Sequence, residues 1–392
     1  MRILMISDVL THPTQMGNRQ RIYRECVQMR RLGWEVDFLY FGNSLGSDMD
    51  MTRSFFGVNH FLQCFKGNYT IKSQAKKRMR DYMDQKGITK YFPLKYNADE
   101  WYTDEIENIV KDLLKKTKYD AIWIQYFFQS KVLECLKDFQ ILKVIDTHDK
   151  WANRNRIYQR IGKVPEYFYT TIKEEKRALQ RADAVIAIQK KEERYFQELL
   201  KDTPVRVLTI GDLVENKHAD IGRDFSYGFI GANNRPNVLG LEWFCKKVLP
   251  FVQNKCPNSK FVVAGGICDC IPDYPGVYKM GRVEKLEDFY NEVQVIINPV
   301  QNGTGLNIKT IEALSYGKPL VTTSIGAKGI DSVKSILVKC DKPQVFADEI
   351  MHLFTDKKLC GELIQNAQEY IRDYNEKNVE ALSCIEKYAM NR

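Results

Sequence analysis

The stretch that decides the fold runs from Val295 to Pro319 and reads VIINPVQNGTGLNIKTIEALSYGKP. It opens with a short apolar strand, Val295 to Ile297, passes through a loop with two glycines, and then takes up the apolar spacing of a helix. A strand, a loop and a helix in this order form the repeating unit of a parallel sheet with crossover helices. This stretch therefore predicts an α/β fold.

The same alternation of apolar strands and amphipathic helices continues on both sides of this stretch. Parallel strands need crossover connections of this kind. We therefore expect a doubly wound parallel sheet in each half of the chain. The expected strands are Arg2–Val9, Trp34–Tyr40, Ala121–Tyr126, Leu142–Asp146 and Ala184–Ile188 in the first half, and Tyr227–Gly231, Phe261–Ala264, Val295–Ile297 and Leu320–Thr322 in the second.

The length of the chain indicates two domains, because 392 residues exceed one typical core. A polar segment after Lys201-Asp202-Thr203-Pro204 marks the change of domain. We expect an N-terminal domain over residues 1–205 and a C-terminal domain over residues 206–375. The helical pattern at the C-terminus is expected to pack back onto the first domain with residues 376–392.

Composition and charge limit where in the cell the protein can act and which partners it can bind. The apolar run in MRILMISDVL is too short to span a bilayer and has no signal-peptide pattern, which predicts a cytoplasmic protein. The ten cysteines lack metal-ligand spacing, so we expect free thiols and no metal site.

The net charge of +9 arises before residue 206, because the later residues hold 23 basic and 23 acidic side chains. This asymmetry suggests an anionic surface or substrate, although a solvated basic face is commoner; we expect no nucleic acid partner.

A basic segment from Lys66 to Lys95 carries much of this charge, with nine basic and two acidic residues. Clustered cations attract anionic lipid headgroups at about 1 kcal/mol each. Two interpretations stay open: an insertion that meets a membrane surface or an acceptor, and an ordinary solvated helix.

The loop of the opening stretch offers groups that bind a diphosphate. Gly303 and Gly305 let the main chain approach a ligand, and the amides up to Asn307 begin a helix whose dipole favours anions. Lys309 adds a positive charge, and Glu312, about one helical turn further on, can accept hydrogen bonds from ribose hydroxyls. A tight, capped strand-to-helix turn without a ligand would have the same pattern.

Two segments resemble the retaining GT-B glycosyltransferases of family 4. NGTGLNIKTIEALSYGKPLVTTSIGAKGI is similar to their donor-binding segment, and YGFIGANNRPNVLGLEWFCKKVLPFVQNKCPNSKFVVAGG is similar to the start of their C-terminal domain. Together they cover most of residues 227–330. Thr304 departs from the pattern, because many members carry a second glutamate at the position eight residues before Glu312.

The resemblance implies a GT-B fold, in which two Rossmann-like domains face a central cleft, with residues 1–205 on the acceptor side and residues 206–375 binding the donor. It implies a hexosyltransferase that uses a nucleotide-diphosphate sugar as co-substrate, retains the anomeric configuration, and needs no metal and no other cofactor. Relatives build surface polysaccharides, so we expect a glycan or lipid-linked acceptor. The expected location is the cytoplasm, with peripheral contact at the anionic inner face of the membrane.

The resemblance also extends to single residues. It implies that Arg235 supplies a cation to the diphosphate, that the main chain at Arg282 and Val283 holds the nucleobase, and that Gly17 and Asn18 open a loop over the phosphates. A solvent-exposed arginine and ordinary turns are the alternatives. The expected donor-binding residues are Gly17, Asn18, Arg235, Arg282, Val283, Gly303, Thr304, Gly305, Leu306, Asn307, Lys309 and Glu312.

A further polar group, Asp146-Thr147-His148-Asp149, follows the apolar strand that begins at Leu142. Related transferases often carry an acid or a histidine here. We expect the catalytic residue to be His148 or Asp149, which would orient the donor sugar and receive the proton of the acceptor. A histidine with a purely structural hydrogen bond is the alternative.

Three other functions fit parts of the sequence. A nucleotide-sugar epimerase would share the two-domain shape, but the basic insertion in the first half weighs against it. A nicotinamide dehydrogenase would need G-x-G-x-x-G after the first strand, where Ser7 to Pro13 has none. A noncatalytic partner of another transferase would explain the Thr304 departure, but Lys309 and Glu312 argue for a working donor site.

Overall fold

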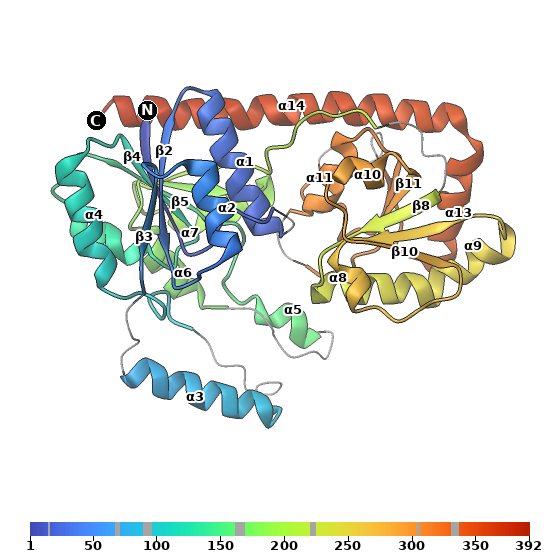
Figure 1. The fold of residues 1–392 in the computed structure, drawn as a ribbon, viewed down its shortest axis with the longest axis horizontal. Coiled ribbons are helices and arrows are strands. Elements are labelled where there is room, and N and C mark those ends of the chain that lie inside the picture. The colour runs from blue at the N-terminus through green and yellow to red at the C-terminus, as the bar shows by residue number, and fades with distance from the viewer. Residues whose placement is uncertain are drawn as a thin grey trace. The chain divides into compact units, whose positions relative to one another are not determined.

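The computed structural model describes residues 1–14, 16–66, 71–88, 96–160, 169–219, 225–303, 306–330 and 337–392. They form two compact units, one of residues 1–213 with 378–392 and one of residues 214–377 (Figure 1). The last helix, α14 (Lys357–Met390), contributes to both units. None of the described helices combines the length and the apolar character needed to cross a bilayer.

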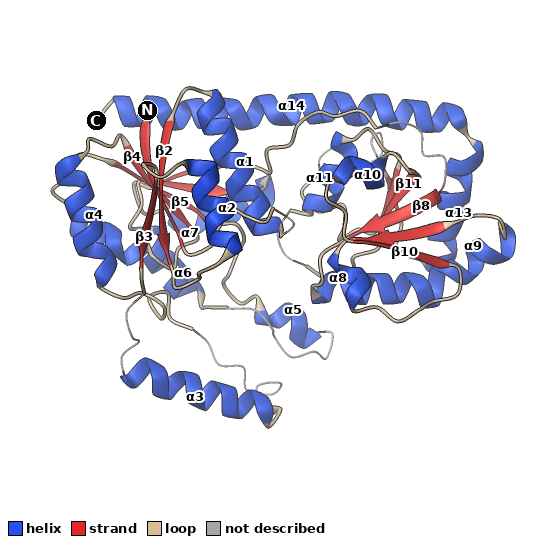
Figure 2. Ribbon diagram, in the orientation of Figure 1, coloured by secondary structure: helices blue, strands red, loops and turns tan. Residues whose placement is uncertain are grey.

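The N-terminal unit is built on a seven-stranded sheet with the order β3-β2-β1-β4-β5-β6-β7 (Figure 2). Every neighbouring pair is parallel, and the order reverses between β1 and β4. The strands are β1 (Arg2–Ser7), β2 (Glu35–Phe41), β3 (Phe61–Cys64), β4 (Ala121–Gln125), β5 (Leu142–Asp146), β6 (Ala184–Ala187) and β7 (Arg206–Thr209).

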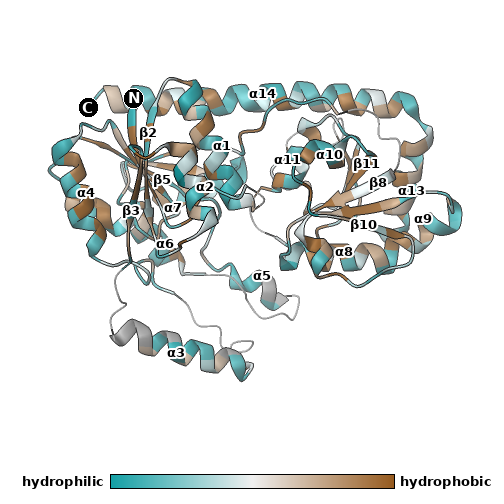
Figure 3. Ribbon diagram, in the orientation of Figure 1, coloured by the Kyte–Doolittle hydropathy of each residue, from teal (hydrophilic) through white to brown (hydrophobic). Residues whose placement is uncertain are grey.

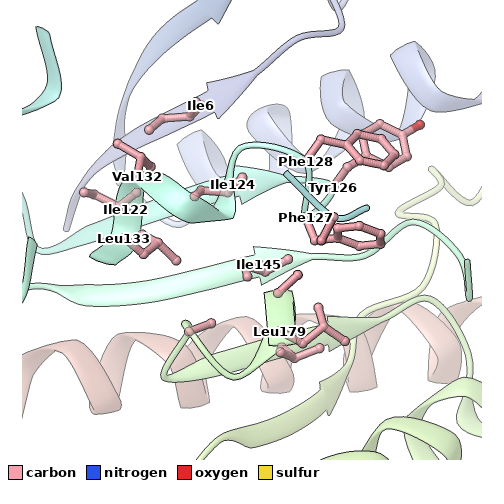
Figure 4. Close-up of a cluster of buried hydrophobic side chains, with 14 of the residues drawn as sticks. Ile6, Ile122, Ile124, Tyr126, Phe127, Phe128, Val132, Leu133, Ile145 and Leu179 are labelled. Carbon is pink, nitrogen blue, oxygen red and sulfur yellow. The ribbon is translucent and has the colours of Figure 1, made fainter. Parts of the chain in front are cut away.

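Helices cover both faces of this sheet because successive strand residues point to opposite sides. In β1, Ile3 and Met5 pack with residues of α1, α2 and α14, whereas Leu4 and Ile6 pack with residues of α4, α6 and α7. Figure 3 shows apolar strands between helices that have a polar side, and Figure 4 shows Ile6, Ile124 and Leu179 within the second cluster. The described helices are α1 (Gly17–Arg31), α2 (Ser47–Phe56), α3 (Ile71–Gln85), α4 (Glu105–Lys116), η2 (Ser130–Leu136), α5 (Asn155–Arg160), α6 (Ile172–Leu179) and α7 (Lys190–Leu200).

The C-terminal unit is built on a six-stranded parallel sheet with the order β10-β9-β8-β11-β12-β13, which reverses between β8 and β11. Phe229 and Val263 lie in a core cluster on one face, together with residues of α8, α9 and α13. The strands are β8 (Phe225–Ile230), β9 (Phe261–Ala264), β10 (Val277–Gly281), β11 (Val293–Asn298), β12 (Leu320–Thr322) and β13 (Val338–Lys339). Its helices besides α14 are α8 (Arg235–Trp243), η3 (Phe244–Val248), α9 (Leu249–Lys255), η4 (Gly266–Asp269), α10 (Leu286–Tyr290), α11 (Ile308–Ser315) and α13 (Pro343–Thr355).

Local sequence explains where several helices begin. The Thr171 side chain accepts a hydrogen bond from the Glu174 amide and caps α6. The Asn234 side chain accepts a hydrogen bond from the Asn237 amide and caps α8, which also has a proline in its first turn. Both patterns are sequence signals for a helix start.

The end of α14 completes the N-terminal unit. Leu382 and Ile385 are fully buried in the cluster that contains β1 residues, and Trp34 Nε1 donates to Glu386 at 3.0 Å. The first unit ends at residue 213 and not near residue 205, because β7 pairs with β6 and completes the sheet.

All nine strands expected from the sequence are present, with ends within two residues of the expected positions. The sequence did not predict the short strands β3, β7, β10 and β13. In β10, exposed and half-buried residues replace the apolar run that marks a central strand. Helix α3 lies within the basic segment, whose residues 67–70 and 89–95 are outside the described part.

The docking of α14 predicts the effect of one substitution. Leu382→Ala removes a completely buried side chain and should lower the free energy of unfolding of the N-terminal unit by about 2 to 5 kcal/mol. Amide hydrogen exchange in β1 and β2 measures this change. The exposed Lys387→Ala on the same helix is the control, and equal exchange in the two variants would show that the contact contributes no stability.

Candidate functional site

Both sheets place polar loops where their strand order reverses. In the C-terminal unit these loops follow β8 and β11, and in the N-terminal unit they follow β1 and β4, with the end of β5 beside them. Ligands of doubly wound sheets bind outside the carboxyl ends of the strands at such reversals. Each unit therefore contains one candidate site.

The loop after β11 is held in place by Asn298. Its Nδ2 donates to Asn307 Oδ1 at 2.9 Å and to Thr310 Oγ1 at 3.0 Å. Its main-chain oxygen accepts a hydrogen bond from Thr322 Oγ1 at 2.9 Å. Asn298 is buried, so water does not compete for these bonds. They join the last residue of β11 to the first turn of α11 and fix where that helix begins.

Two glycines allow the neighbouring loops to approach closely. A Cβ on Gly240 in α8 would lie 2.8 Å from the main-chain oxygen of Pro299. Gly265 has φ +90°, and a Cβ there would lie 2.4 Å from the main-chain oxygen of Gly231. Side chains at these positions would force the loops after β8, β9 and β11 apart.

Within the described part of the chain, no side chain caps the N-terminus of α11. Asn307 stands at the N-cap position without a capping side-chain hydrogen bond, and the first turn has no acidic residue. The oxygen that would cap the helix, Asn307 Oδ1, accepts from Asn298 instead. The first amides of α11 thus keep the partial positive charge that binds phosphate groups.

The predicted residues around this helix start are only partly described. Leu306 is buried, and the main-chain oxygen of Gly303 accepts a hydrogen bond from Lys328 Nζ at 2.8 Å. Thr304 and Gly305 lie outside the described residues.

Lys309 and Glu312 extend from the first turns of α11. Burial lowers the pKa of Lys309, and the charge of Glu312 partly opposes this shift. No ion pair joins Lys309 to another residue of the described ranges. Glu312 is 6% exposed, and its Oε1 accepts a hydrogen bond from the Tyr290 hydroxyl at 3.1 Å. A cation that has lost water without gaining an ion pair favours the approach of an anion.

A chain of side chains supports Glu312 from behind. The Tyr290 ring stacks on Tyr316 with 4.1 Å between the ring centroids. Lys217 Nζ donates to the Tyr316 hydroxyl at 3.2 Å and forms an ion pair with Glu287. The position of the Glu312 carboxylate therefore depends on residues outside the sequence motif.

The loops after β8, β9 and β10 meet one another in the C-terminal unit. Arg235 is the first residue of α8, and Arg282 and Val283 follow β10. A Cβ on Gly266 would lie 3.8 Å from both Arg282 Nη2 and the Asn233 amide nitrogen. The guanidinium of Arg282 is exposed and donates to Asp269 at 3.1 Å.

In the N-terminal unit, the loops after β1, β4 and β5 meet at the side chain of Tyr126. Gly17 and Asn18 open α1, which has neither a capping side chain nor an acidic residue in its first turn. The Asn18 side chain hydrogen-bonds the Tyr126 hydroxyl. The Tyr126 ring stacks on His148 with 4.0 Å between centroids, and both residues have positive φ angles, 62° and 57°. Positive φ in non-glycine residues concentrates at functional sites.

His148 itself is buried and neutral. Its Nε2 lies 2.5 Å from Gln125 Oε1, and the side chain is 5% exposed. Burial lowers the pKa of His148 to about 4, and the nearby charge of Asp146 only partly offsets this. The imidazole therefore carries no charge near pH 7.

Three buried ionisable residues, Arg21, Asp146 and Glu25, lie close to His148. Arg21 Nε and Nη2 donate to the two carboxylate oxygens of Asp146 at 2.9 and 3.0 Å. Gln125 Nε2 donates to Glu25 Oε2 at 2.6 Å. Burial and the charge of Asp146 raise the pKa of Glu25 to about 8. The network thus contains one ion pair and one carboxyl group that holds its proton at neutral pH.

Asp149 is engaged by its own neighbours. Its Oδ2 lies 3.1 Å from Arg154 Nη2, and its Oδ1 accepts from the Lys150 amide at 2.8 Å. Burial and the Asp149 carboxylate together hold the pKa of Glu192 well above its usual range. Both carboxylate oxygens of Asp149 are thus already engaged by neighbouring residues.

Several residues of the two sites did not stand out in the sequence. Glu25 and Gln125 lie under His148, and Tyr290 and Asn298 hold the α11 region. The one available signal was a polar residue at the end of an apolar strand, at Gln125 in AIWIQ and Asn298 in VQVIIN. Glu25 and Tyr290 are ordinary helix residues in the sequence, and only the fold brings them to the site.

The Glu25 network predicts how stability depends on pH. The folded-state pKa of Glu25 lies above its usual value of 4.5, so its contribution to stability is complete below about pH 4.5 and is lost as the pH rises through about 8. Glu25→Gln cannot ionise and should become progressively more stable relative to the natural chain over this interval. Thermal unfolding at several pH values measures the difference. The exposed Glu198→Gln is the control, and a difference that stays constant with pH would contradict the prediction.

Comparisons with known proteins match both the sequence of the C-terminal unit and the whole fold. Residues 224–356 match the family model of glycosyl transferases group 1. A protein from the cps region of Klebsiella pneumoniae, described as uncharacterized, is 29% identical over 166 residues, which are 38% of this chain and 43% of that protein. The match thus spans less than half the length of this curated relative.

Solved structures resemble the chain over nearly its full length. Sucrose-phosphate synthase from Thermosynechococcus elongatus has a TM-score of 0.66 at 15% identity, covering 99% of this chain and 98% of that one. The pneumococcal O-GlcNAc transferase GtfA, solved with UDP and GlcNAc, has a TM-score of 0.67 at 11% identity, covering 100% and 99%. Anabaena HepE, solved with UDP, has a TM-score of 0.64 at 14% identity, covering 98% and 100%.

These likenesses confirm the predicted GT-B architecture of two Rossmann-like domains. The identities to the solved structures are too low to carry over a substrate. Residues 224–356 are thus similar to the group 1 glycosyl transferases, and the chain that contains them has the GT-B fold.

Proposed function

We propose that this chain is a glycosyltransferase that moves a sugar from a nucleotide-diphosphate donor to a glycan or lipid-linked acceptor in surface polysaccharide biosynthesis. The observation that carries this proposal is the uncapped start of α11, with Lys309 and Glu312 in the turns that follow. It lies within residues 224–356, which match the group 1 family.

The α11 region supplies the charges that a leaving diphosphate needs. The free amides at the helix start and the Lys309 ammonium stabilise the negative charge that grows as the glycosidic bond breaks. Arg235 adds a guanidinium from the loop after β8. The resemblance implies that Gly303, Thr304 and Gly305 let the main chain approach the phosphates, and that Gly17 and Asn18 also contribute to donor binding.

The nucleoside is held by Glu312 and by main-chain groups. Glu312 accepts hydrogen bonds from the ribose hydroxyls, with the Tyr290 hydroxyl fixing the carboxylate from behind. The main chain at Arg282 and Val283 contacts the base. The proposed reaction retains the anomeric configuration and uses no metal ion or other cofactor, as the family resemblance implies.

His148 is the better of the two candidates for contact with the sugar. It is neutral, and the stacked Tyr126 ring fixes its orientation. The Asp149 carboxylate is already engaged by Arg154. Asp149 then acts by orienting the loop that carries His148.

The acceptor and the membrane contact rest on two observations. The Klebsiella relative is named for its place in a cps region, which favours a role in surface polysaccharide. Helix α3 exposes Met79 and Tyr82 by 51% and 57%, beside the exposed cations Arg78 and Lys86. Apolar side chains flanked by cations suit an anionic bilayer surface at the inner face of the membrane.

A thermal-shift panel tests the donor site. One nucleotide class among UDP-, GDP-, ADP-, dTDP- and CMP-sugars should stabilise the natural chain, by about 2.7 kcal/mol at a concentration 100 times its Kd. Glu312→Ala and Lys309→Met should lose most of this stabilisation, whereas the exposed Lys358→Met should keep it. If no nucleotide sugar stabilises the natural chain, the noncatalytic alternative replaces the proposal.

Sedimentation with anionic vesicles tests the membrane contact. Replacing Arg78 and Lys86 by glutamine should weaken binding at low salt by about 2 kcal/mol, or about 30-fold. Glutamine at the exposed Lys115 and Lys116 of α4 provides a control with the same change in charge. Equal weakening in the two double variants would show that binding depends only on net charge and not on α3. If the natural chain does not sediment with the vesicles, the proposed membrane contact is wrong.

A further inference from the structure

The polar network below His148 determines which ring nitrogen carries the proton. Gln125 Nε2 faces two acceptors, Glu25 Oε2 at 2.6 Å and Met5 Sδ at 3.6 Å. An amide nitrogen donates and an amide oxygen accepts, so this placement turns Gln125 Oε1 towards His148. The carbonyl oxygen lies 2.5 Å from His148 Nε2 and can only accept. The neutral ring therefore carries its hydrogen on Nε2.

Glu25 makes this orientation of Gln125 stable. It is 2% exposed and holds a proton at neutral pH, because burial and the Asp146 charge disfavour its ionised form. Its Oε2 accepts the hydrogen bond from the Gln125 amide. The charged groups near the ring are Asp146 from β5 and Arg21 from α1, which form an ion pair with each other.

The second ring nitrogen, Nδ1, is left with a lone pair. It makes no hydrogen bond with any residue of the described ranges, and it is not among the polar atoms sealed from solvent without a partner. Tyr126 covers one face of the ring. Nδ1 is therefore the ring nitrogen that remains for a ligand.

We propose that Gln125 and Glu25 are positioning residues that fix His148 in the Nε2–H form, so that Nδ1 accepts a hydrogen bond from a hydroxyl of the donor sugar. This inference rests on the proposed function for its ligand, but the state of the ring is a property of the chain alone. A bare nitrogen favours a sugar with a hydroxyl at the contacted position. It rejects a carbonyl or carboxylate oxygen there, because two acceptors repel each other.

Nitrogen-15 spectra of histidine-labelled full-length protein test the ring state between pH 5.5 and 8. The chain has five histidines, so the His148→Gln variant identifies the signals of interest. Natural protein should show protonated Nε2 and bare Nδ1 throughout this range. Gln125→Leu removes the acceptor and should give a mixture of the two tautomers. Glu25→Gln keeps a neutral acceptor for the Gln125 amide and should leave the ring unchanged.

A second measurement connects the ring state to the sugar. Gln125→Leu should bind the free nucleoside diphosphate as tightly as the natural chain, but it should lose about 10-fold in affinity for the corresponding nucleotide sugar, the equivalent of one hydrogen bond of about 1.4 kcal/mol. A purely structural role would weaken both ligands equally or neither.

Three results overturn the inference. They are a natural ring protonated at Nδ1, a ring that takes up a second proton above pH 6, and a Gln125→Leu variant with an unchanged tautomer. Failure of the proposed function has a different signature. No nucleotide would bind, while the spectra would still report the tautomer.

Discussion

The ion pair between Arg21 and Asp146 is the interaction on which the N-terminal site depends. Both residues are buried, and a buried pair is tolerated only when its remaining hydrogen-bonding groups are also satisfied. Arg21 meets this condition by donating to the main-chain oxygens of Ile210 and Gly211 as well. The pair thereby joins α1, β5 and the segment after β7, and its carboxylate keeps Glu25 protonated and His148 in place.

The sequence predicted the positions of nine strands and the polar loops that follow some of them. Buried strands of parallel sheets are continuous apolar runs, which are legible one segment at a time. The network under His148 is not local, because Glu25 lies on α1, Gln125 on β4 and His148 after β5. The amino-acid sequence does not show that Glu25 of α1 will accept a hydrogen bond from Gln125 of β4.

In the C-terminal unit, too, the sequence predicted local features but not contacts between distant residues. The glycine loop and the spacing of Lys309 and Glu312 predicted a phosphate-binding helix start, because those features lie within one short segment. The support for Glu312 comes from Tyr290 on α10, which only the tertiary structure brings close. The boundary of the first unit lies at residue 213 and not at the predicted residue 205 for a related reason. The strand β7 is short and partly exposed, so its pairing with β6 has no strong apolar signal.

The two candidate sites differ in their electrostatics, and on the proposed function the difference suits the two parts of a nucleotide sugar. At α11, the first turn has no acidic residue and burial lowers the pKa of Lys309, so on the proposed function a diphosphate supplies negative charge there. At His148, charge is balanced internally by Arg21 and Asp146, while Glu25 and the imidazole are neutral. Such a surface gains nothing from an ion but offers directed hydrogen bonds to uncharged hydroxyls. On the proposed function, one unit therefore binds the donor through charge and the other distinguishes its sugar through hydrogen-bond geometry.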